Sequence, residues 1–550
     1  MPGTTTAYVN TVVFTGDTSD LLGSAFAVRG ERVLAVGDEA EVRAAAGAEA
    51  AVVDLGGAFS MPGVSEAHAH LSGFGHAVSK VQLRDCDTLE QILDRLEAAR
   101  RADPGATRIE GVSWRFDALP EGVSRPTAAM LDAVIGDIPV FLDANDLHST
   151  WVNTAALRVL GIDEGTPDPV GGEIVRDEHG RATGFLLETA AMELVLPYLD
   201  GITSDEERDG FMDRAFDAYL AAGVTSAVDM AMGESALSTL RRRLERDGRL
   251  PFPVTAHWLV LPTGDPAADL AQVDRAAELR DELAESGTPW LGIAGVKLIL
   301  DGVIDACTAM MERPYADGSN ADPIWSRSAA TPVAIAADRL GLQLAMHAIG
   351  DAASALAVDL VVACEEANGP RVERRPRIEH LESVSERTIA RMREHEVIAS
   401  MQPVHCDPAI LDNWIAMLGD DRAERGFPWR SFRDGGVALA LGTDAPTAPH
   451  EALHNLYIAM TGGSALDPAR APYHPERAFA PREALAAATS GAAFAGGFEH
   501  AYGRIAPGRY ANVAVLDRDP LVGDPGELLT ASTILTLVHG EVAYRAPHAD

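Results

Sequence analysis

The sequence of 550 residues predicts an α/β fold with an eight-stranded parallel (β/α)8 barrel at its centre. Strand and helix patterns alternate with short linkers between about residues 223 and 445, which is typical of βα units around a parallel sheet. Seven strand candidates lie in that stretch and one precedes it, and eight strands close such a barrel. A hydrophobic content of 47% supplies a large core.

The predicted strands are short segments of strand character, and the predicted helices carry apolar residues three and four positions apart. The strands are Ala58–Ala67, Val224–Met230, Val254–Val260, Gly292–Leu300, Leu342–His347, Arg377–His380, Val397–Gln402 and Val437–Gly442. The helices are Asp205–Ala222, Ala267–Glu285, Ala352–Ala367 and Ser385–His395.

Both ends of the chain predict β-strands. A hairpin with its turn at Gly30 spans Ser24–Val36, and Ala51–Asp54 follows it, while Tyr510–Leu516 and Ile534–Tyr544 repeat the pattern near the other end. Neither end has enough strands to be stable alone. We therefore expect the two ends to pair into one composite β-sandwich.

Residues 71–203 are too many for a connection between a strand and a helix. They contain a strand pattern at Ile138–Ala144, a helix pattern at Ala155–Leu160 and a hairpin pattern around Gly171–Gly184. We expect an inserted α/β subdomain over the barrel mouth. The predicted order is 1–60 first half of the sandwich, 61–70 first barrel strand, 71–203 insertion, 204–495 rest of the barrel, and 496–550 second half of the sandwich.

The net charge of the chain limits the classes of binding partner that are expected. Forty-five basic against 82 acidic residues leave a net charge of −37, which repels phosphate backbones and anionic lipid surfaces. We expect a small-molecule substrate, no nucleic acid and no membrane, and a homodimer as the default assembly. The beginning of the chain has no signal-peptide pattern, so a cytoplasmic location is expected. The four cysteines lie far apart without a CxxC pair, which argues against a disulfide framework or a thiolate zinc site.

Lysine is nearly absent, because only Lys80 and Lys297 occur among the 45 basic residues. Lys297 lies in an apolar run of strand character, where an unpaired ammonium costs several kcal/mol. One interpretation is an ion pair with Asp301 or Asp305. The other is that the amine is carboxylated to a carbamate, an anionic metal ligand that arginine cannot form.

Histidines and one aspartate occur where a barrel enzyme places its site. His68 and His70 are two residues apart after a strand pattern, so both imidazoles project from one face. That pair alone is equally compatible with polar loop histidines. His347, His380 and Asp444, however, lie at or just past the carboxyl ends of predicted strands. Imidazoles with a carboxylate suit zinc or a similar divalent ion.

Short motifs extend along nearly the whole chain. They are Met61-Pro-Gly, His68-Ala-His70, Gly295-Val-Lys297, His347 to Asp351, Arg377-Ile-Glu-His380, Gly442-Thr-Asp-Ala-Pro446, Asp146 to Ala156, Gly171 to Glu188, Gly503 to Gly508, and Ala514 to Asp517. As a set, they resemble the motif series of the amidohydrolase superfamily, in the branch of the YtcJ-like proteins and N-substituted formamide deformylase (the amidohydrolase 3 family).

The resemblance implies a distorted (β/α)8 TIM barrel, a composite sandwich and a centre of one or two divalent ions, with zinc the first candidate. His68, His70 and Asp444 would hold one ion, and His347 and His380 the other. Lys297, in carboxylated form, would lie between the two ions.

The implied activity is hydrolysis of a non-peptide C–N bond in a small N-acyl or N-formyl amide. Metal-bound hydroxide would attack the carbonyl, and Asp444 would carry the proton to the leaving amine. Ligation alone is the other role open to Asp444.

Two further interpretations stay open. The same scaffold supports C–C chemistry, either decarboxylation or retro-aldol cleavage, because function depends on the site rather than the fold. A catalytically silent ligand-binding protein is the third interpretation, and the intact set of predicted ligands counts against it.

Substrate contacts are predicted at His148, Trp151, Asp305 and His405. His148 and Trp151 belong to the insertion motif, although Trp151 suits the subdomain core equally well. His405 follows the seventh barrel strand, where it can orient a substrate oxygen.

The chain departs from the family pattern at two places. Glu66 replaces the usual aspartate, and its longer arm is expected to tilt His68 or His70. Residues 303–308 replace the Gly-Ser-Arg-Thr stretch that relatives often have, which puts Asp305 and Cys307 near the pocket. We therefore expect a substrate that differs from those of the best-known relatives.

Overall fold

The computed structural model describes residues 4–17, 22–123, 125–144, 149–169, 172–371 and 373–547. The chain divides into two compact units, one formed by Met1–Leu71 with Phe216–Asp550 and the other by Ser72–Ala215. The second boundary falls inside one long helix, α7 (Asp205–Ala221).

Eight parallel strands form the barrel of the first unit, in the order β20-β19-β18-β17-β16-β15-β14-β7, which confirms the predicted fold class. The strands are β7 (Val64–Ala69), β14 (Val224–Met232), β15 (Val254–Leu259), β16 (Leu291–Ile299), β17 (Gln343–Ala348), β18 (Arg377–His380), β19 (Ile398–Met401) and β20 (Leu439–Leu441).

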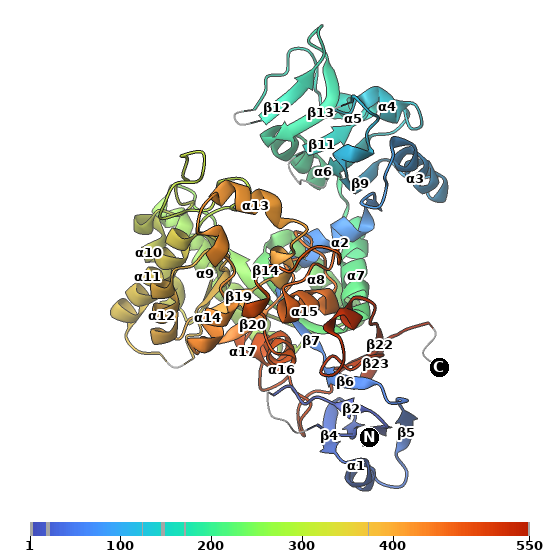
Figure 1. Ribbon diagram of the computed structural model, residues 1–550, viewed down its shortest axis with the longest axis vertical. Coiled ribbons are helices and arrows are strands. Elements are labelled where there is room, and N and C mark those ends of the chain that lie inside the picture. The colour runs from blue at the N-terminus through green and yellow to red at the C-terminus, as the bar shows by residue number, and fades with distance from the viewer. Residues whose placement is uncertain are drawn as a thin grey trace. The chain divides into compact units, whose positions relative to one another are not determined.

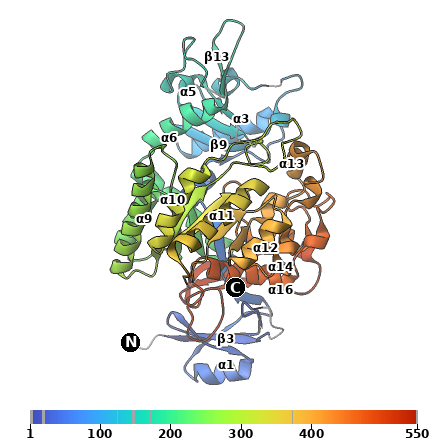
Figure 2. The same cartoon turned by 90° about the vertical axis from the view of Figure 1, so that its left-hand side faces the viewer.

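Helices cover the outside of the barrel, and Figure 2 shows α9 to α12 along one side of it. The principal helices are α8 (Glu234–Asp247), α9 (Pro266–Ser286), α10 (Arg327–Arg339), α11 (Asp351–Asn368), α12 (Glu386–Glu394), α13 (Leu411–Leu418), α14 (Trp429–Asp434), α15 (Ala452–Thr461), α16 (Pro481–Ala486) and α17 (Ala492–Ala495). Side chains cap several of them: Ser326 and Ser385, for example, each accept a hydrogen bond from the first turn of α10 and α12.

The strands β20 and β7 lie at the two ends of the barrel sheet, and residues around the predicted site join them. The backbone N–H of Asp444 donates to the carbonyl of His68 at 2.9 Å. The Glu66 carboxylate accepts from the backbone N–H groups of His68 at 3.0 Å and Thr443 at 2.8 Å. The seam of the barrel therefore holds His68 and Asp444 next to each other.

The prediction of one strand over Ala58–Ala67 is wrong. This segment is two strands, β6 (Phe59–Pro62) in the sandwich and β7 in the barrel. Gly63 separates them at a point where a Cβ would lie 2.2 Å from the side chain of Thr225. The close approach requires glycine there, and the chain changes sheet at this residue.

Both ends of the chain form the sandwich, as the sequence predicts. One sheet has the order β4-β3-β1-β5 and the other has the order β2-β6-β21-β22-β23, which mixes strands from the two ends (Figure 1). A shared core lies between the sheets and includes Tyr8, Phe26, Val513 and Leu535. The elements are β1 (Thr5–Val9), β2 (Val12–Val13), β3 (Ala25–Arg29), β4 (Arg32–Gly37), α1 (Glu39–Ala46), β5 (Ala51–Asp54), β21 (Val513–Leu516), β22 (Thr533–Val538) and β23 (Glu541–Arg545).

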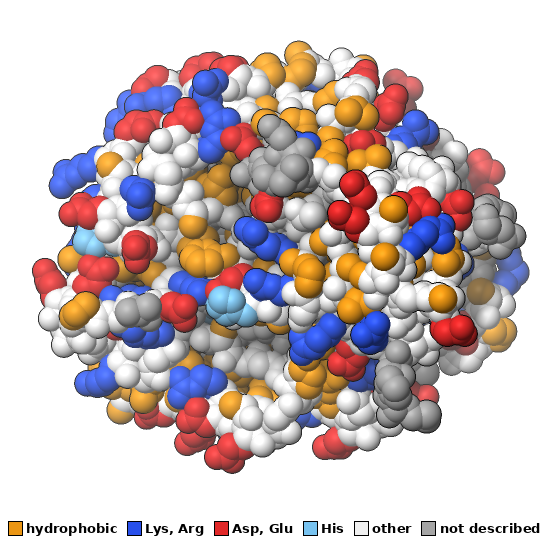
Figure 3. Space-filling view, turned by 90° about the horizontal axis from the view of Figure 1, so that it is seen from below, with side chains coloured by type: hydrophobic (Ala, Val, Ile, Leu, Met, Phe, Trp, Pro, Cys, Tyr) orange, Lys and Arg blue, Asp and Glu red, His pale blue; other side chains and the backbone are white. Residues whose placement is uncertain are grey.

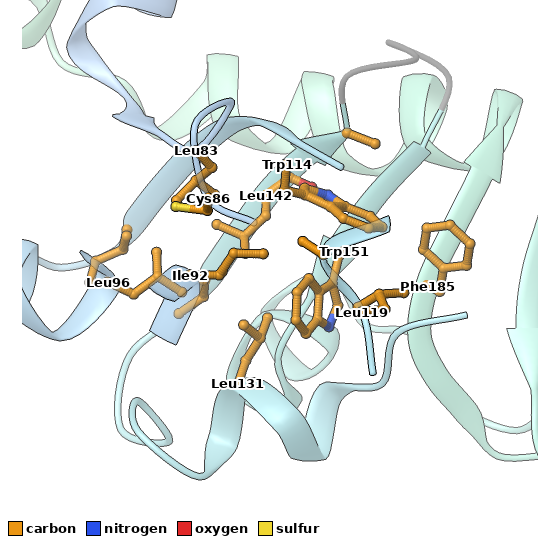
Figure 4. Close-up of a cluster of buried hydrophobic side chains, with 14 of the residues drawn as sticks. Leu83, Cys86, Ile92, Leu96, Trp114, Leu119, Leu131, Leu142, Trp151 and Phe185 are labelled. Atoms are coloured by element: carbon orange, nitrogen blue, oxygen red, sulfur yellow. The ribbon is translucent and has the colours of Figure 1, made fainter. Parts of the chain in front are cut away.

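The second unit is an α/β subdomain with a six-stranded sheet in the order β12-β13-β11-β10-β9-β8. Its core contains Trp114, Trp151 and Phe185, whose side chains lie together in Figure 4. Its elements are β8 (Val81–Gln82), α3 (Leu89–Ala102), β9 (Ile109–Trp114), α4 (Ala128–Asp132), β10 (Val140–Ala144), β11 (Ser149–Val152), α5 (Thr154–Val159), β12 (Gly172–Arg176), β13 (Ala182–Glu188) and α6 (Leu196–Ile202), with α2 (Leu71–Ser79) at its start.

Acidic and basic side chains are interspersed on the face that Figure 3 shows. Many of the arginines form ion pairs, such as Arg95 with Asp85 and Arg375 with Glu499. Among the described residues, no helix has both the length and the apolar character needed to cross a membrane.

Candidate metal centre

The six predicted ligands belong to five barrel strands or to the residues that follow them. His68 lies within β7 and His70 just after it, Lys297 within β16, His347 within β17, His380 at the end of β18, and Asp444 after β20. All eight strands are parallel, so their carboxyl ends meet at one end of the barrel.

His68, His70 and Asp444 form the tightest group. One potential ligand atom from each lies within 4.8 Å of the other two. The Asp444 Oδ1 atom is 2.9 Å from Nε2 of His70 and 3.4 Å from Nε2 of His68. Two imidazoles and one carboxylate thus converge on a point that a divalent cation can occupy.

A second group shares the same carboxylate. Oδ2 of Asp444 is 3.8 Å from Nδ1 of His380 and 3.5 Å from Nε2 of His405. One potential ligand atom from each of these three residues lies within 4.8 Å of the other two. His405, which the sequence assigns to substrate contact, is therefore also a candidate ligand. His347 adjoins this group through its ring, whose centroid is 4.3 Å from that of His380.

Burial keeps three of the imidazoles in their neutral, metal-binding form. It lowers the pKa of His68 to about 4 and that of His347 to about 3, and it holds the pKa of His380 well below its ordinary value. Burial alone would raise the pKa of Asp444, but His68 and His70 hold it well below the ordinary range. At neutral pH, His68, His347 and His380 thus offer neutral nitrogens and Asp444 an anionic oxygen. The pKa of His70 is instead raised, because its hydrogen bond to Asp444 and the charge of that carboxylate outweigh burial.

A buried ion pair orients the first of these imidazoles. Oε2 of Glu379 lies 2.8 Å from Nδ1 of His68, and Arg377 donates from Nε to Oε1 of Glu379 at 2.6 Å. With its Nδ1–H donated to Glu379, His68 presents Nε2 toward Asp444. The sequence motif contains Arg377 and Glu379, but nothing local in it reveals this contact with a strand remote in sequence.

Glu66 acts on the backbone rather than on the imidazoles. Besides its two backbone bonds, it accepts a hydrogen bond from the Thr443 hydroxyl at 2.8 Å. Burial raises the pKa of Glu66 to about 7, although these hydrogen bonds oppose the shift. The longer side chain of Glu66 is expected to tilt His68 or His70, but its hydrogen bonds go to the backbone of His68 and to Thr443. Glu66 therefore joins the two edges of the barrel sheet.

Lys297 is 2% exposed, and its Nζ has no hydrogen-bond partner among the described residues. Lys80, by contrast, donates to Asp143 at 2.6 Å. Burial lowers the pKa of Lys297 to about 8, against the opposing charges of Glu379 and Asp444. A buried amine without a partner requires another group to complete its surroundings.

Neither ion pair considered for Lys297 is found among the described contacts. Asp301 instead accepts backbone N–H groups from Ile349 at 3.1 Å, Gly350 at 2.9 Å and Met310 at 2.9 Å. Asp305 is exposed and accepts a hydrogen bond from Asn413 at 3.0 Å. The ion-pair interpretation is therefore not supported.

The residues present fit a divalent cation. Lys297 Nζ, His380 Nδ1 and His405 Nε2 are all buried, and in the described part of the chain none has a hydrogen-bond partner. Native proteins rarely leave such atoms unsatisfied. Imidazole nitrogens and carboxylate oxygens are the usual donors to zinc and related ions.

The predicted substrate contacts have different surroundings. Trp151 is fully buried in the core of the second unit and donates from Nε1 to the carbonyl of Thr127 at 2.9 Å, so the core alternative holds for it. His148 lies outside the described residues. Only His405 is placed within the metal-ligand group.

Two residues near the site are not predicted from the sequence. Glu382 accepts a hydrogen bond from Nε1 of Trp414 at 2.8 Å and lies 3.5 Å from Nδ1 of His405. Gln402 is 2% exposed at the end of β19. Glutamate and glutamine are too common for a single sequence to single out these two.

Comparisons with known proteins agree with this geometry. The N-substituted formamide deformylase of Arthrobacter pascens is 31% identical, with 98% of this chain and 97% of the relative covered. The protein LONG AFTER FAR-RED 3 of Arabidopsis thaliana is 30% identical, with 97% and 91% covered. The crystal structure of an uncharacterized metal-dependent hydrolase from Pyrococcus horikoshii OT3 superposes with a TM-score of 0.76 at 26% identity, covering 95% of this chain and 99% of that one.

The resemblance drawn from the motifs is thus confirmed over almost the whole length of the chain. Residues 51–544 match the amidohydrolase family. The chain therefore belongs to the amidohydrolase family.

Proposed function

We propose that this protein is a metal-dependent hydrolase that cleaves the C–N bond of a small N-acyl or N-formyl amide. The observation that carries the proposal is one buried carboxylate, Asp444, shared between two groups of imidazoles at the carboxyl end of the barrel. The similarity to an N-substituted formamide deformylase over nearly the full length of both chains supports an amide substrate.

His68, His70 and Asp444 would hold one divalent ion, with zinc as the first candidate, and His347 and His380 would contribute to a second. Lys297 would join them after its amine adds carbon dioxide, which forms a C–N bond and releases one proton. The resulting carbamate oxygens supply the anionic ligand that an ammonium cannot. A bound divalent ion supplies Lewis acidity, which polarises a carbonyl and lowers the pKa of water.

Asp444 is the proton carrier in this proposal. Its carboxylate is anionic at neutral pH and lies next to the group of imidazoles, so it can accept a proton from the attacking water. The same oxygen can then deliver the proton to the departing amine nitrogen. Glu66 and the Asp444 backbone bond to His68 fix the position of this carboxylate relative to the imidazoles.

The test is a turnover assay of the zinc-loaded protein with a panel of N-formyl and N-acyl amides. The expected products are one amine and one carboxylate per amide consumed, and a chelator abolishes their release. Release of carbon dioxide from the substrate would favour the decarboxylase alternative. Tight binding of the amides without turnover across the panel would favour a silent binding protein.

A further inference from the structure

Gln402 is a buried amide without a partner. Its side chain is 2% exposed, and neither Oε1 nor Nε2 has a hydrogen-bond partner among the described residues. Leaving both ends of a buried amide unsatisfied costs free energy, and native proteins seldom do so away from functional sites.

The strand geometry directs Gln402 toward the barrel axis. Glu379 on β18 reaches His68 on β7, which lies three strands away, and this contact crosses the barrel interior. Arg377 lies in the same interior and donates to the hydroxyl of Ser400 at 2.7 Å. Gln402 follows Ser400 by two residues in extended backbone, with φ −121° and ψ 90°, so it shares that inward face.

Gln402 also lies at the site end of the barrel. It directly follows β19, and its turn continues to His405, whose Nε2 is 3.5 Å from Asp444. Asn455 fixes this turn, since it accepts from the backbone N–H of Val404 at 3.0 Å and donates to the carbonyl of Gly442 at 3.0 Å. The amide is thus held on a supported turn at the same end as the candidate ligands.

A second buried glutamine of the barrel is fully bonded. Gln343 on β17 donates from Nε2 to the carbonyls of Arg375 at 2.6 Å and Ala495 at 2.9 Å, and its Oε1 lies 3.0 Å from Nε2 of His257. It lies at the amino end of its strand, away from the site. The protein therefore completes the hydrogen bonds of a buried glutamine at one end of the barrel and leaves them open at the other.

We propose that Gln402 binds the amide group of the substrate, with its Oε1 accepting the substrate N–H and its Nε2 donating to a substrate oxygen. This inference rests on the proposed amide hydrolysis and names the feature of the substrate that the site recognises. The substrate class is an amide that carries at least one N–H, because a fully substituted nitrogen or an ester oxygen offers no hydrogen to Oε1.

The decisive comparison is Gln402→Met against Gln343→Met, both in the zinc-loaded full chain. Methionine is nearly isosteric and apolar, so it removes the hydrogen-bonding groups with little change of volume. Gln402→Met is expected to keep the melting temperature and the zinc content and to lower kcat/KM for a secondary amide by about 10- to 100-fold. Gln343→Met is expected to lower the melting temperature.

A structural role for Gln402 would give the opposite pattern, a lower melting temperature with unchanged kcat/KM, and would overturn the proposal. So would a loss of zinc from Gln402→Met, since the residue would then act through the metal. If the melting temperature, the zinc content and kcat/KM of Gln402→Met all stayed unchanged, the proposal would also be contradicted.

The second arm compares a secondary amide with the ester of the same acyl group. Gln402→Met is expected to reduce kcat/KM for the amide at least tenfold more than for the ester, because the ester has no N–H to lose. Equal reductions would contradict recognition of the N–H. If wild-type protein cleaves the ester but no amide, the proposed function itself fails, and that result is distinct from a failure of the role of Gln402.

Discussion

Arg377 and Lys297 are both cations buried in the barrel interior, and they differ in their hydrogen-bond partners. Arg377 donates to Glu379, to the carbonyl of Ala67 and to the hydroxyl of Ser400, whereas Lys297 has no hydrogen-bond partner in the described part of the chain. Neighbouring groups of the barrel therefore stabilise the charge of Arg377, although its Nη1 atom has no hydrogen-bond partner among the described residues. The carboxyl end keeps nitrogen atoms unsatisfied, as a site that receives an ion and a substrate requires.

The largest effect is expected at the carboxyl end, from Asp444→Asn. Asparagine has nearly the same shape but cannot accept the proton, so kcat should fall by about 10²- to 10⁴-fold. Steady-state kinetics on protein of measured zinc content checks this. The control is Asp274→Asn, an exposed aspartate on α9, which should leave kcat unchanged. A loss of less than fivefold in Asp444→Asn would remove the proton-carrier role.

In the middle of the barrel, Arg377→Met should lower the free energy of unfolding by about 3–5 kcal/mol, because the buried Glu379 carboxylate would lose its ion-pair partner. Urea denaturation of the metal-free protein measures this quantity. The exposed Arg246 provides the control, since Arg246→Met should change the free energy by less than about 0.5 kcal/mol. Equal effects of the two substitutions would contradict the contrast between the two cations.

Lys297→Met should change the free energy of unfolding in the opposite direction from Arg377→Met. It removes a buried charge without a partner, so the free energy of unfolding of the metal-free protein should rise by about 1–3 kcal/mol at pH 7. The loaded protein should lose at least one ion, and Lys297→Arg should also lose an ion while it stays folded. Full zinc content and turnover in Lys297→Arg would refute the carbamate ligand.

The smallest expected effect is the contribution of His257, on β15, to the pH dependence of the free energy of unfolding. Burial, with the charge of Arg377, lowers its pKa to about 3, below the value of about 6.5 expected in the unfolded chain. The unfolded state therefore binds more protons between these values, and stability is lost as the pH falls. From pH 7.5 to 5.5 this residue should account for a loss of about 1.4 kcal/mol in the free energy of unfolding.

The measurement for His257 is urea denaturation of the metal-free protein at both pH values. His257→Gln removes the titrating group. Between pH 7.5 and 5.5 the variant should therefore lose about 1.4 kcal/mol less of its free energy of unfolding than the wild type. An identical pH dependence in wild type and variant would show that the imidazole is not held neutral by the fold.

The sequence predicted the features that depend on neighbouring residues. Seven of the eight predicted barrel strands each coincide with a single strand, and His347, His380 and Asp444 follow directly from their positions at or after strand ends. The exception is Ala58–Ala67, where the chain changes sheet at Gly63, next to the side chain of Thr225, a residue remote in sequence.

The partners of the ligands could not be predicted in the same way. Glu379 meets His68 and Glu66 meets Thr443 across more than 300 positions of sequence. Gln402 is informative only because its amide is both buried and unbonded, which no sequence pattern shows. Trp151 has the same aromatic character in a core as in a substrate wall, and its burial decides between the two.

Anomalous diffraction from a crystal of the zinc-loaded protein, with data collected at the zinc absorption edge, tests the proposed metal centre directly. We expect an anomalous peak within bonding distance of His68, His70 and Asp444, and continuous density from Lys297 Nζ to a carboxyl group. Fully ordered ligand side chains with no anomalous peak between them would contradict the proposed metal centre.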